Sequence, residues 1–189
     1  MKIGILSDSH LKSGYAKEVI DLLKEKNCEY LIHAGDFCCE KNLQLLKESN
    51  LKYIVVFGNN DRDLFDLASK YNIKSEPYYF KIEDLKFKLM HLPYHLTPDS
   101  NIVIFGHTPV QRVLQTANIY YVDTGAAFKE DGFGKLTLLQ IQPELQIHQI
   151  DNNQTAELHH PTERSTSGEH SSNTARHRIL SFRYFTNLW

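Results

Sequence analysis

The 189-residue sequence contains no apolar run that approaches the roughly 18 residues needed to cross a bilayer. Its 21 lysines and arginines are balanced by 23 aspartates and glutamates, so it lacks the cationic excess with which proteins bind nucleic acid broadly. It has three cysteines, an odd number, and its first residues show no apolar stretch followed by a signal cleavage site. We therefore expect a cytoplasmic protein with no membrane segment and no broad nucleic-acid-binding surface.

The length and composition predict one folded domain with a short appendage. A domain typically has roughly 100 to 200 residues, so 189 residues correspond to about one domain. The 41% of hydrophobic residues is ordinary for a globular protein. The composition changes after residue 150: the remaining residues contain no lysine, are rich in Ser, Thr, Asn and His, and have few apolar residues before Ile179. We expect a domain over residues 1–150 and a flexible or atypical tail over residues 151–189.

Apolar runs alternate with helical patterns in the first half of the chain. Each run is followed by polar residues and then by apolar residues at helical spacing. Three such units in succession predict parallel strands with right-handed crossovers. The predicted strands are residues 2–6, 30–34 and 53–57, and the predicted helices lie around residues 19–23, 43–46 and 64–71.

The apolar pattern changes to a period of two from residue 78. Residues 78–82 and 87–91 alternate in polarity on either side of Glu83 and Asp84, which predicts a hairpin. β-α units followed by a β-rich half indicate an α/β fold in which two sheets pack face to face with helices outside. The further predicted strands are residues 102–105, 119–122, 136–141 and 145–150.

Polar side chains follow many of these strands at the points where they end. Ligands of open α/β sheets bind outside the carboxyl ends of the strands, so we expect these side chains to converge. Carboxylate, amide and imidazole groups at five strand ends together predict a metal site. The residues concerned are Asp8 and His10, Asp36, Asn59 with Asn60 and Asp61, His91, and His107.

Three glycines and two cysteines accompany these residues. Gly35, Gly58 and Gly106 directly precede Asp36, Asn59 and His107, and glycine permits sharp turns that bring the backbone close to a ligand. Cys38 and Cys39 lie close to the first of these turns in sequence, and we expect them to pack rather than to bind metal.

The ordered series resembles the calcineurin-like metallophosphoesterase superfamily, and its spacing is most similar to the small prokaryotic YfcE-type phosphodiesterases. The resemblance covers residues 1 to about 150 and implies a two-sheet α/β/β/α sandwich with two divalent ions at its edge. Carried over by position, Asp8 and His10 bind the first ion, Asp36 bridges both, and the second ion is bound by Asn59, His91 and His107. A donor set without thiolate favours Mn²⁺, with Fe, Ni, Zn or Mg as alternatives.

Two positions depart from the superfamily pattern. Asn60 stands where most members carry a histidine that acts on the phosphate or leaving group, and an amide is no general acid near neutral pH. Pro109 replaces the last histidine of the Gly-His-x-His motif, so the first ion loses a donor. His95 is either a substitute acid or a solvated loop residue. The candidate catalytic residues are Asn60, Asp61 and His95, while Arg62 either contacts phosphate or faces solvent.

The resemblance implies a phosphoesterase that hydrolyses a small phosphorylated substrate, a diester or a monoester, with a metal-bound hydroxide. A serine/threonine-type protein phosphatase or dinucleoside polyphosphate hydrolase is an alternative, because the sequence from Gly106 to Pro109 resembles that branch. A non-catalytic scaffold like the retromer subunit with this fold is another, because Asn60 and Pro109 make a loss of activity conceivable. The oligomeric state is left open by the sequence.

Overall fold

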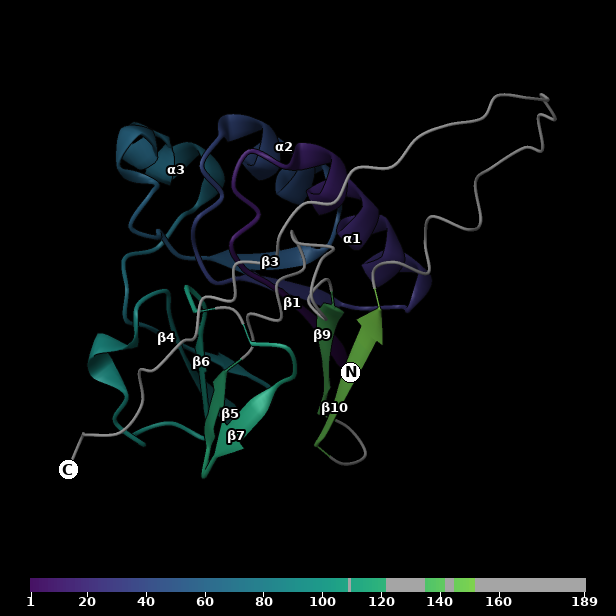
Figure 1. Ribbon diagram of the computed structural model, residues 1–189, viewed down its shortest axis with the longest axis vertical. Coiled ribbons are helices and arrows are strands. Elements are labelled where there is room, and N and C mark those ends of the chain that lie inside the picture. Colours follow the sequence, from purple (N-terminus) through teal and green to yellow (C-terminus); the bar gives the residue numbers. More distant parts are fainter. Residues whose placement is uncertain (109, 122–134, 142–144, 152–189) are drawn as a thin grey trace, which may run out of the picture.

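The computed structural model describes residues 1–108, 110–121, 135–141 and 145–151, which form two five-stranded sheets (Figure 1). The first sheet has the order β10-β9-β1-β2-β3 and consists of β1 (Lys2–Leu6), β2 (Tyr30–His33), β3 (Lys52–Val55), β9 (Lys135–Gln140) and β10 (Gln146–Asp151). The second has the order β4-β5-β6-β8-β7 and consists of β4 (Tyr78–Ile82), β5 (Leu85–Met90), β6 (Ile102–Phe105), β7 (Leu114–Thr116) and β8 (Ile119–Tyr121).

Helices cover one side of the first sheet. Figure 1 shows α1, α2 and α3 together on that side and the second sheet on the opposite side. The helical elements are α1 (Ser13–Glu25), α2 (Glu40–Glu48), the 3-10 helix η1 (Arg62–Leu67), α3 (Ala68–Tyr71) and the short 3-10 helix η2 (Pro93–His95). Within the described ranges, none of these helices combines the length and the apolar character that a membrane crossing requires.

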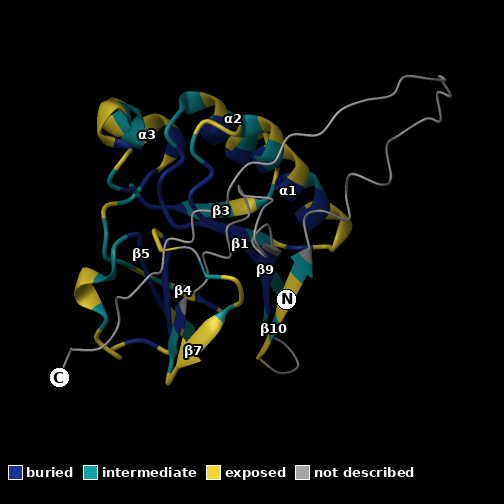
Figure 2. Cartoon of the chain, viewed as in Figure 1, coloured by how far each residue is buried: buried dark blue, intermediate teal, exposed yellow. Residues whose placement is uncertain are grey.

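Two hydrophobic cores follow from the alternation of side chains along the strands. Leu31 of β2 belongs to the core between the first sheet and the helices, with Leu23 of α1 and Leu43 of α2. Its neighbour Ile32 belongs to the core between the two sheets, with Phe87 of β5. These side chains are fully buried, and each such burial contributes roughly 1.5–3 kcal/mol. Figure 2 shows the buried strands enclosed between the exposed outer faces of the helices and of the second sheet.

The register of the parallel strands brings the functional loops to one edge. In the first sheet Leu6 pairs with His33, and His33 pairs with Val55, so β1, β2 and β3 end at the same level. In the second sheet Met90 at the end of β5 pairs with Phe105 at the end of β6. The loops that follow all five strands therefore leave the sandwich at ends that are in register within each sheet.

The predicted α/β fold with two facing sheets is confirmed, with local differences. The helix predicted around residues 64–71 is divided into η1 and α3, with the bond from Ala68 N–H to Phe65 O, three residues back, at the junction, and α3 is followed by Asn72, whose φ is 54°. The strand β7 was not predicted. The predicted hairpin and the strands near residues 102, 119, 136 and 145 are present, while Val122, Pro109 and the tail from residue 152 lie outside the described residues.

Candidate metal centre

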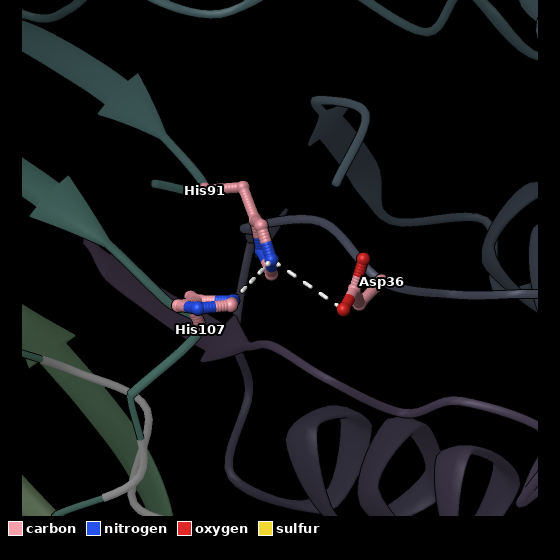
Figure 3. Close-up of side chains that lie close together, drawn as sticks. All are labelled: Asp36, His91 and His107. Atoms are coloured by element: carbon pink, nitrogen blue, oxygen red, sulfur yellow. Dashed lines mark hydrogen bonds and ion pairs between the residues drawn. The ribbon is translucent and has the colours of Figure 1, made fainter. Parts of the chain in front are cut away.

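The described residues contain three groups of potential metal ligands, and the two that include histidines meet at the edge where the strands end. Asp36, which follows β2, is common to both groups. In each group the donor atoms lie within 4.8 Å of one another. The first group consists of Asp8, His10 and Asp36, and the second of Asp36, His91 and His107. The predicted convergence of these five residues is therefore present, and Figure 3 shows the second group, with His91 between the other two side chains.

Asp36 is a buried carboxylate that receives several hydrogen bonds. The side chain is 1% exposed, and the backbone N–H and side-chain amide of Asn60 donate to its two oxygens at 2.8 and 2.6 Å. Nε2 of His91 lies 3.4 Å from its Oδ2. Burial raises the pKa of Asp36, but the hydrogen bonds from His91 and Asn60 outweigh burial and hold the pKa well below its usual value. The carboxylate is therefore ionised at neutral pH.

His91 presents its Nε2 to the site. Its side chain is fully buried, and its Nδ1 lies 2.8 Å from the carbonyl oxygen of Ala34, an acceptor that requires the hydrogen on Nδ1. Nε2 lies 2.9 Å from Asn59 Oδ1 and 3.2 Å from Nδ1 of His107. The predicted ligand Asn59 thus joins the second group.

The electrostatics at His91 favour a positive charge. Burial lowers the pKa of His91, but the hydrogen bond to Asp36 and the negative charge of Asp8 outweigh burial and raise it to about 9. A proton on Nε2 or a metal ion in front of it can supply that charge. The oxygen and imidazole donors of both groups fit a divalent first-row ion.

Asp8 joins the two sheets at this edge. One of its oxygens accepts hydrogen bonds from Ser7 Oγ and from the backbone N–H of His107, the latter at 3.0 Å. The other oxygen lies 3.7 Å from Nε2 of His10. Nδ1 of His10 in turn lies 3.3 Å from Sγ of Cys38.

The site residues adopt unusual backbone conformations. Positive φ values occur at Asp8 (53°), His10 (44°), Asp36 (57°), Cys38 (55°) and His107 (67°). A non-glycine residue held in this region costs on the order of 1–3 kcal/mol, and the surrounding structure must supply that energy. Such a concentration of strained residues at one place is typical of a functional site.

The glycines that precede Asp36 and Asn59 allow site side chains to approach the backbone closely, while the predicted approach to a ligand stays a prediction. Gly35 has a φ of 91°, and a Cβ atom there would lie 2.7 Å from Nδ1 of His91. A Cβ atom on Gly58 would lie 2.2 Å from Oδ1 of Asp36. Both contacts are too short for any side chain, so these two positions need glycine for the site to close.

Asp61 is buried and is bonded to backbone groups of two site loops. Its carboxylate is 0% exposed and accepts the backbone N–H groups of Asp36, Cys38 and Gly58 at 2.8, 2.7 and 2.7 Å. Burial raises its pKa. The structure therefore shows a positioning role for Asp61, and the catalytic role predicted from the sequence stays a prediction.

The other predicted residues occupy different places. Asn60 is exposed and contacts Asp36. His95 is exposed at the end of η2, and none of the potential metal groups found among the described residues includes it. Arg62 is exposed at the start of η1. Pro109 lies outside the described residues.

Two positioning residues were missed by the sequence analysis. Asn42 of α2 is 1% exposed. Its Nδ2 lies 3.1 Å from Ser9 Oγ, 2.5 Å from the backbone oxygen of His10 and 2.8 Å from the backbone oxygen of Phe37. The carboxylate of Glu76 accepts the backbone N–H groups of His91 and Leu92. The only sequence signal for Asn42 is an amide on the buried face of an amphipathic helix.

Comparison with known proteins identifies the architecture. Residues 1–143 match the model of the calcineurin-like phosphoesterase superfamily domain. The chain belongs to this superfamily. It is 27% identical over 138 residues to phosphodiesterase MJ0936 of Methanocaldococcus jannaschii, and the match covers 66% of this chain and 83% of the relative. The predicted resemblance and the predicted enzyme class, a phosphoester hydrolase, are confirmed.

Solved structures show the same fold. An archaeal phosphodiesterase matches with a TM-score of 0.69 and 24% identity, over 79% of this chain and 99% of that chain. The phosphoesterase YfcE from E. coli matches with a TM-score of 0.58 and 21% identity, over 81% of this chain and 100% of that chain. The expected similarity to YfcE-type proteins is therefore present in the fold.

Proposed function

We propose that this chain hydrolyses phosphodiesters at a site that holds two divalent ions. The observation that carries the proposal is that Asp36 belongs to both groups of potential ligands. One ion is assigned to Asp8, His10 and Asp36, and the other to Asp36 with the three donors Asn59, His91 and His107. A shared carboxylate can bridge two ions at the separation of about 3.5–4 Å that two-metal phosphoesterases use.

The residues around the site support this chemistry in distinct ways. Bound ions supply the activation of a water molecule and the binding of phosphoryl oxygens. Ala34 O keeps the hydrogen of His91 on Nδ1, so that the Nε2 lone pair is available. Asn60 holds both oxygens of Asp36 in place. Asp8 fixes the loop that carries His107.

We further propose Mn²⁺ as the working ion, because the assigned set mixes carboxylate, amide and imidazole donors and contains no thiolate. Fe, Ni, Zn and Mg remain the alternatives for the same donors. The three cysteines are free thiols, which agrees with the proposed location in a reducing cytoplasm.

The proposed substrate is a small diester with a good leaving group. Asn60 is an exposed residue whose backbone and side-chain N–H groups donate to the shared carboxylate, and its amide cannot protonate a departing oxygen. An aryl phosphodiester needs little protonation because its phenolate leaves readily. The relative MJ0936, which is named a phosphodiesterase, supports a diester as substrate.

The deciding experiment combines metal content with a substrate panel. Purified protein is loaded with Mn²⁺ and assayed with an aryl phosphodiester, an aryl phosphomonoester, a phosphopeptide and diadenosine tetraphosphate. We expect the aryl diester to be hydrolysed fastest and the rate to depend on added metal. Faster hydrolysis of the phosphopeptide or of the dinucleotide would establish the alternative phosphatase function. Metal binding without hydrolysis of any substrate would establish a scaffold.

A further inference from the structure

Cys38 contacts the histidine assigned to the first ion. Its Sγ lies 3.3 Å from Nδ1 of His10, while Nε2 of the same ring lies 3.7 Å from Asp8 Oδ1. The imidazole ring therefore lies between a sulfur atom on one nitrogen and a carboxylate on the other. The assigned ion is bound by the carboxylate side, so the sulfur occupies the rear of the ring.

The backbone holds the sulfur at this place. The N–H of Cys38 donates to Oδ1 of the fully buried Asp61 at 2.7 Å, and Cys38 has a φ of 55°. The loop that carries Cys38 is therefore fixed on the carboxylate of Asp61. Only the rotation about the Cα–Cβ bond then decides whether Sγ of this half-buried side chain reaches the ring.

The neighbouring cysteine makes different contacts. Sγ of Cys39 lies 3.9 Å from the backbone oxygen of His10 and 3.6 Å from Oγ of Ser13. These partners are a main-chain carbonyl and a hydroxyl, not the imidazole ring. Cys39 is therefore a matched control for Cys38, with the same chemistry and the same partial burial at the next position.

A histidine that binds metal through Nε2 must carry its hydrogen on Nδ1, and an acceptor at Nδ1 fixes that tautomer. For His91 the acceptor is the carbonyl oxygen of Ala34. For His10 the atom at the equivalent place is Sγ of Cys38. In both ion sites, therefore, a protein atom lies within hydrogen-bonding distance of the Nδ1 of the histidine, a carbonyl oxygen in one and a sulfur atom in the other.

We propose that Cys38 is a positioning residue that accepts the Nδ1 hydrogen of His10 and so keeps the Nε2 lone pair turned toward Asp8. The contact allows either the Nδ1 hydrogen or the thiol hydrogen to be the donor, and we assign the first of these; the effect on the first ion rests on the proposed function. Loss of such an outer partner typically weakens metal binding by about 10- to 100-fold.

Direct ligation by the thiol is the competing arrangement. Cys38 also belongs to a third group of potential ligands with Asp36 and Asp61, whose donor atoms lie within 4.8 Å of one another. Asp61, however, accepts three backbone N–H groups from two loops. An ion in the third group would compete with these backbone bonds, which hold the loops in place.

The test compares Cys38→Ala and Cys38→Ser with the control Cys39→Ala. Nitrogen NMR of the metal-free proteins reports the tautomer of His10, whose signal is assigned with His10→Ala. We expect the Nδ1–H form in the parent, in Cys39→Ala and largely in Cys38→Ser, whose hydroxyl can accept the same hydrogen. Cys38→Ala should show a mixture of both tautomers. An unchanged tautomer in Cys38→Ala would overturn the proposal.

Calorimetric titration with Mn²⁺ measures the consequence. The weaker of two affinities should fall at least about tenfold in Cys38→Ala and change less than about twofold in Cys39→Ala. Equal losses in both variants would overturn the positioning role. A thiolate-to-metal charge-transfer band with Co²⁺ would also overturn it, because the sulfur would then be a ligand. If the parent binds neither Mn²⁺ nor Fe²⁺, Ni²⁺, Zn²⁺ or Mg²⁺, the proposed function fails, and the NMR comparison still decides the role of Cys38.

Discussion

The carboxylate of Asp8 accepts a hydrogen bond from the backbone N–H of His107, 3.0 Å away and 99 residues further along the chain. Asp8 follows the central strand of the first sheet, and His107 follows the central strand of the second. The bond therefore joins the two sheets at the edge where the ligand groups meet. Five predictions test the site that is built on this junction.

Asp36→Asn should remove most of the phosphodiesterase activity. The amide keeps the shape of the side chain but has only one oxygen and no charge, so it cannot bridge two ions. Metal content measured by elemental analysis should fall from about two ions toward one or none. Asp84→Asn, an exposed change in the hairpin turn, is the control and should leave both values unchanged. Unaltered metal content and rate in Asp36→Asn would refute the bridging role.

Asp61→Ala should destabilise the fold by about 3 kcal/mol, because three backbone N–H donors lose a charged acceptor inside the protein. Urea denaturation followed by circular dichroism measures the loss. Asp63→Ala removes an exposed carboxylate of η1 and should change the free energy of unfolding by less than about 0.5 kcal/mol. Similar stabilities of the two variants would show that the loops do not depend on Asp61.

Acid should destabilise the protein partly through His33. Burial, with a contribution from the charge of His91, lowers the pKa of His33 to about 3, and Ser9 Oγ lies 2.9 Å from its Nε2. His33 therefore stays neutral in the folded chain, whereas in the unfolded chain it is protonated below about pH 6.5. The free energy of unfolding decreases as the pH falls from about 6.5 toward 3.

The slope of stability against pH in that window should decrease by up to about 1.4 kcal/mol per pH unit in His33→Gln. His95→Gln, an exposed control, should keep the slope of the parent. Urea titrations at several pH values supply both slopes. Identical slopes in all three proteins would show that His33 does not titrate differently in the folded and unfolded states.

The rate should depend steeply on the leaving group, because Asn60 offers no proton to the departing oxygen. An uncompensated negative charge on the departing oxygen raises the activation free energy, and each 1.4 kcal/mol lowers the rate about tenfold. Aryl diesters should therefore react far faster than alkyl diesters. Asn60→His should improve the poor substrates selectively. A flat dependence in the parent that His95→Ala makes steep would assign the acid role to His95.

Pro109→His should tighten the weaker of the two metal affinities. The first ion has three assigned protein donors in the described residues, whereas the second has four, and an imidazole at position 109 would add one to the first. Titration calorimetry of the parent should show two unequal affinities that become more similar in the variant. Equal affinities in the parent would contradict this account of the site.

Much of the fold and the metal groups could be predicted from patterns within single segments. Apolar runs with a helical or two-residue period predicted most strands and both long helices, because burial on one face imposes the period. Polar residues at strand ends predicted the candidate ligands, since parallel strands have their carboxyl ends at one edge of the sheet. Asp8, His10, Asp36, His91 and His107 were all found in this way.

The residues that support the ligands could not be predicted, because their partners belong to other loops. Asp61 bonds to backbone N–H groups and Asn42 mainly to backbone oxygens, and main-chain groups leave no trace in a sequence. The contact of Cys38 could not be predicted either, because its partner, the His10 side chain, lies 28 residues away in another loop.

The hydrogen bond between Asp8 and His107 joins residues that are far apart in the sequence, and this separation affects the order in which the protein folds. Closing a loop of this length has to precede any gain from the bond between Asp8 and His107, and such long-range contacts slow folding. A chain that has formed β1 to β3 but has not docked β5 and β6 carries one ligand group and lacks the histidines of the other. Metal binding at the proposed second group would therefore require the assembled sandwich. The rate at which this binding develops during refolding would report when the second sheet docks.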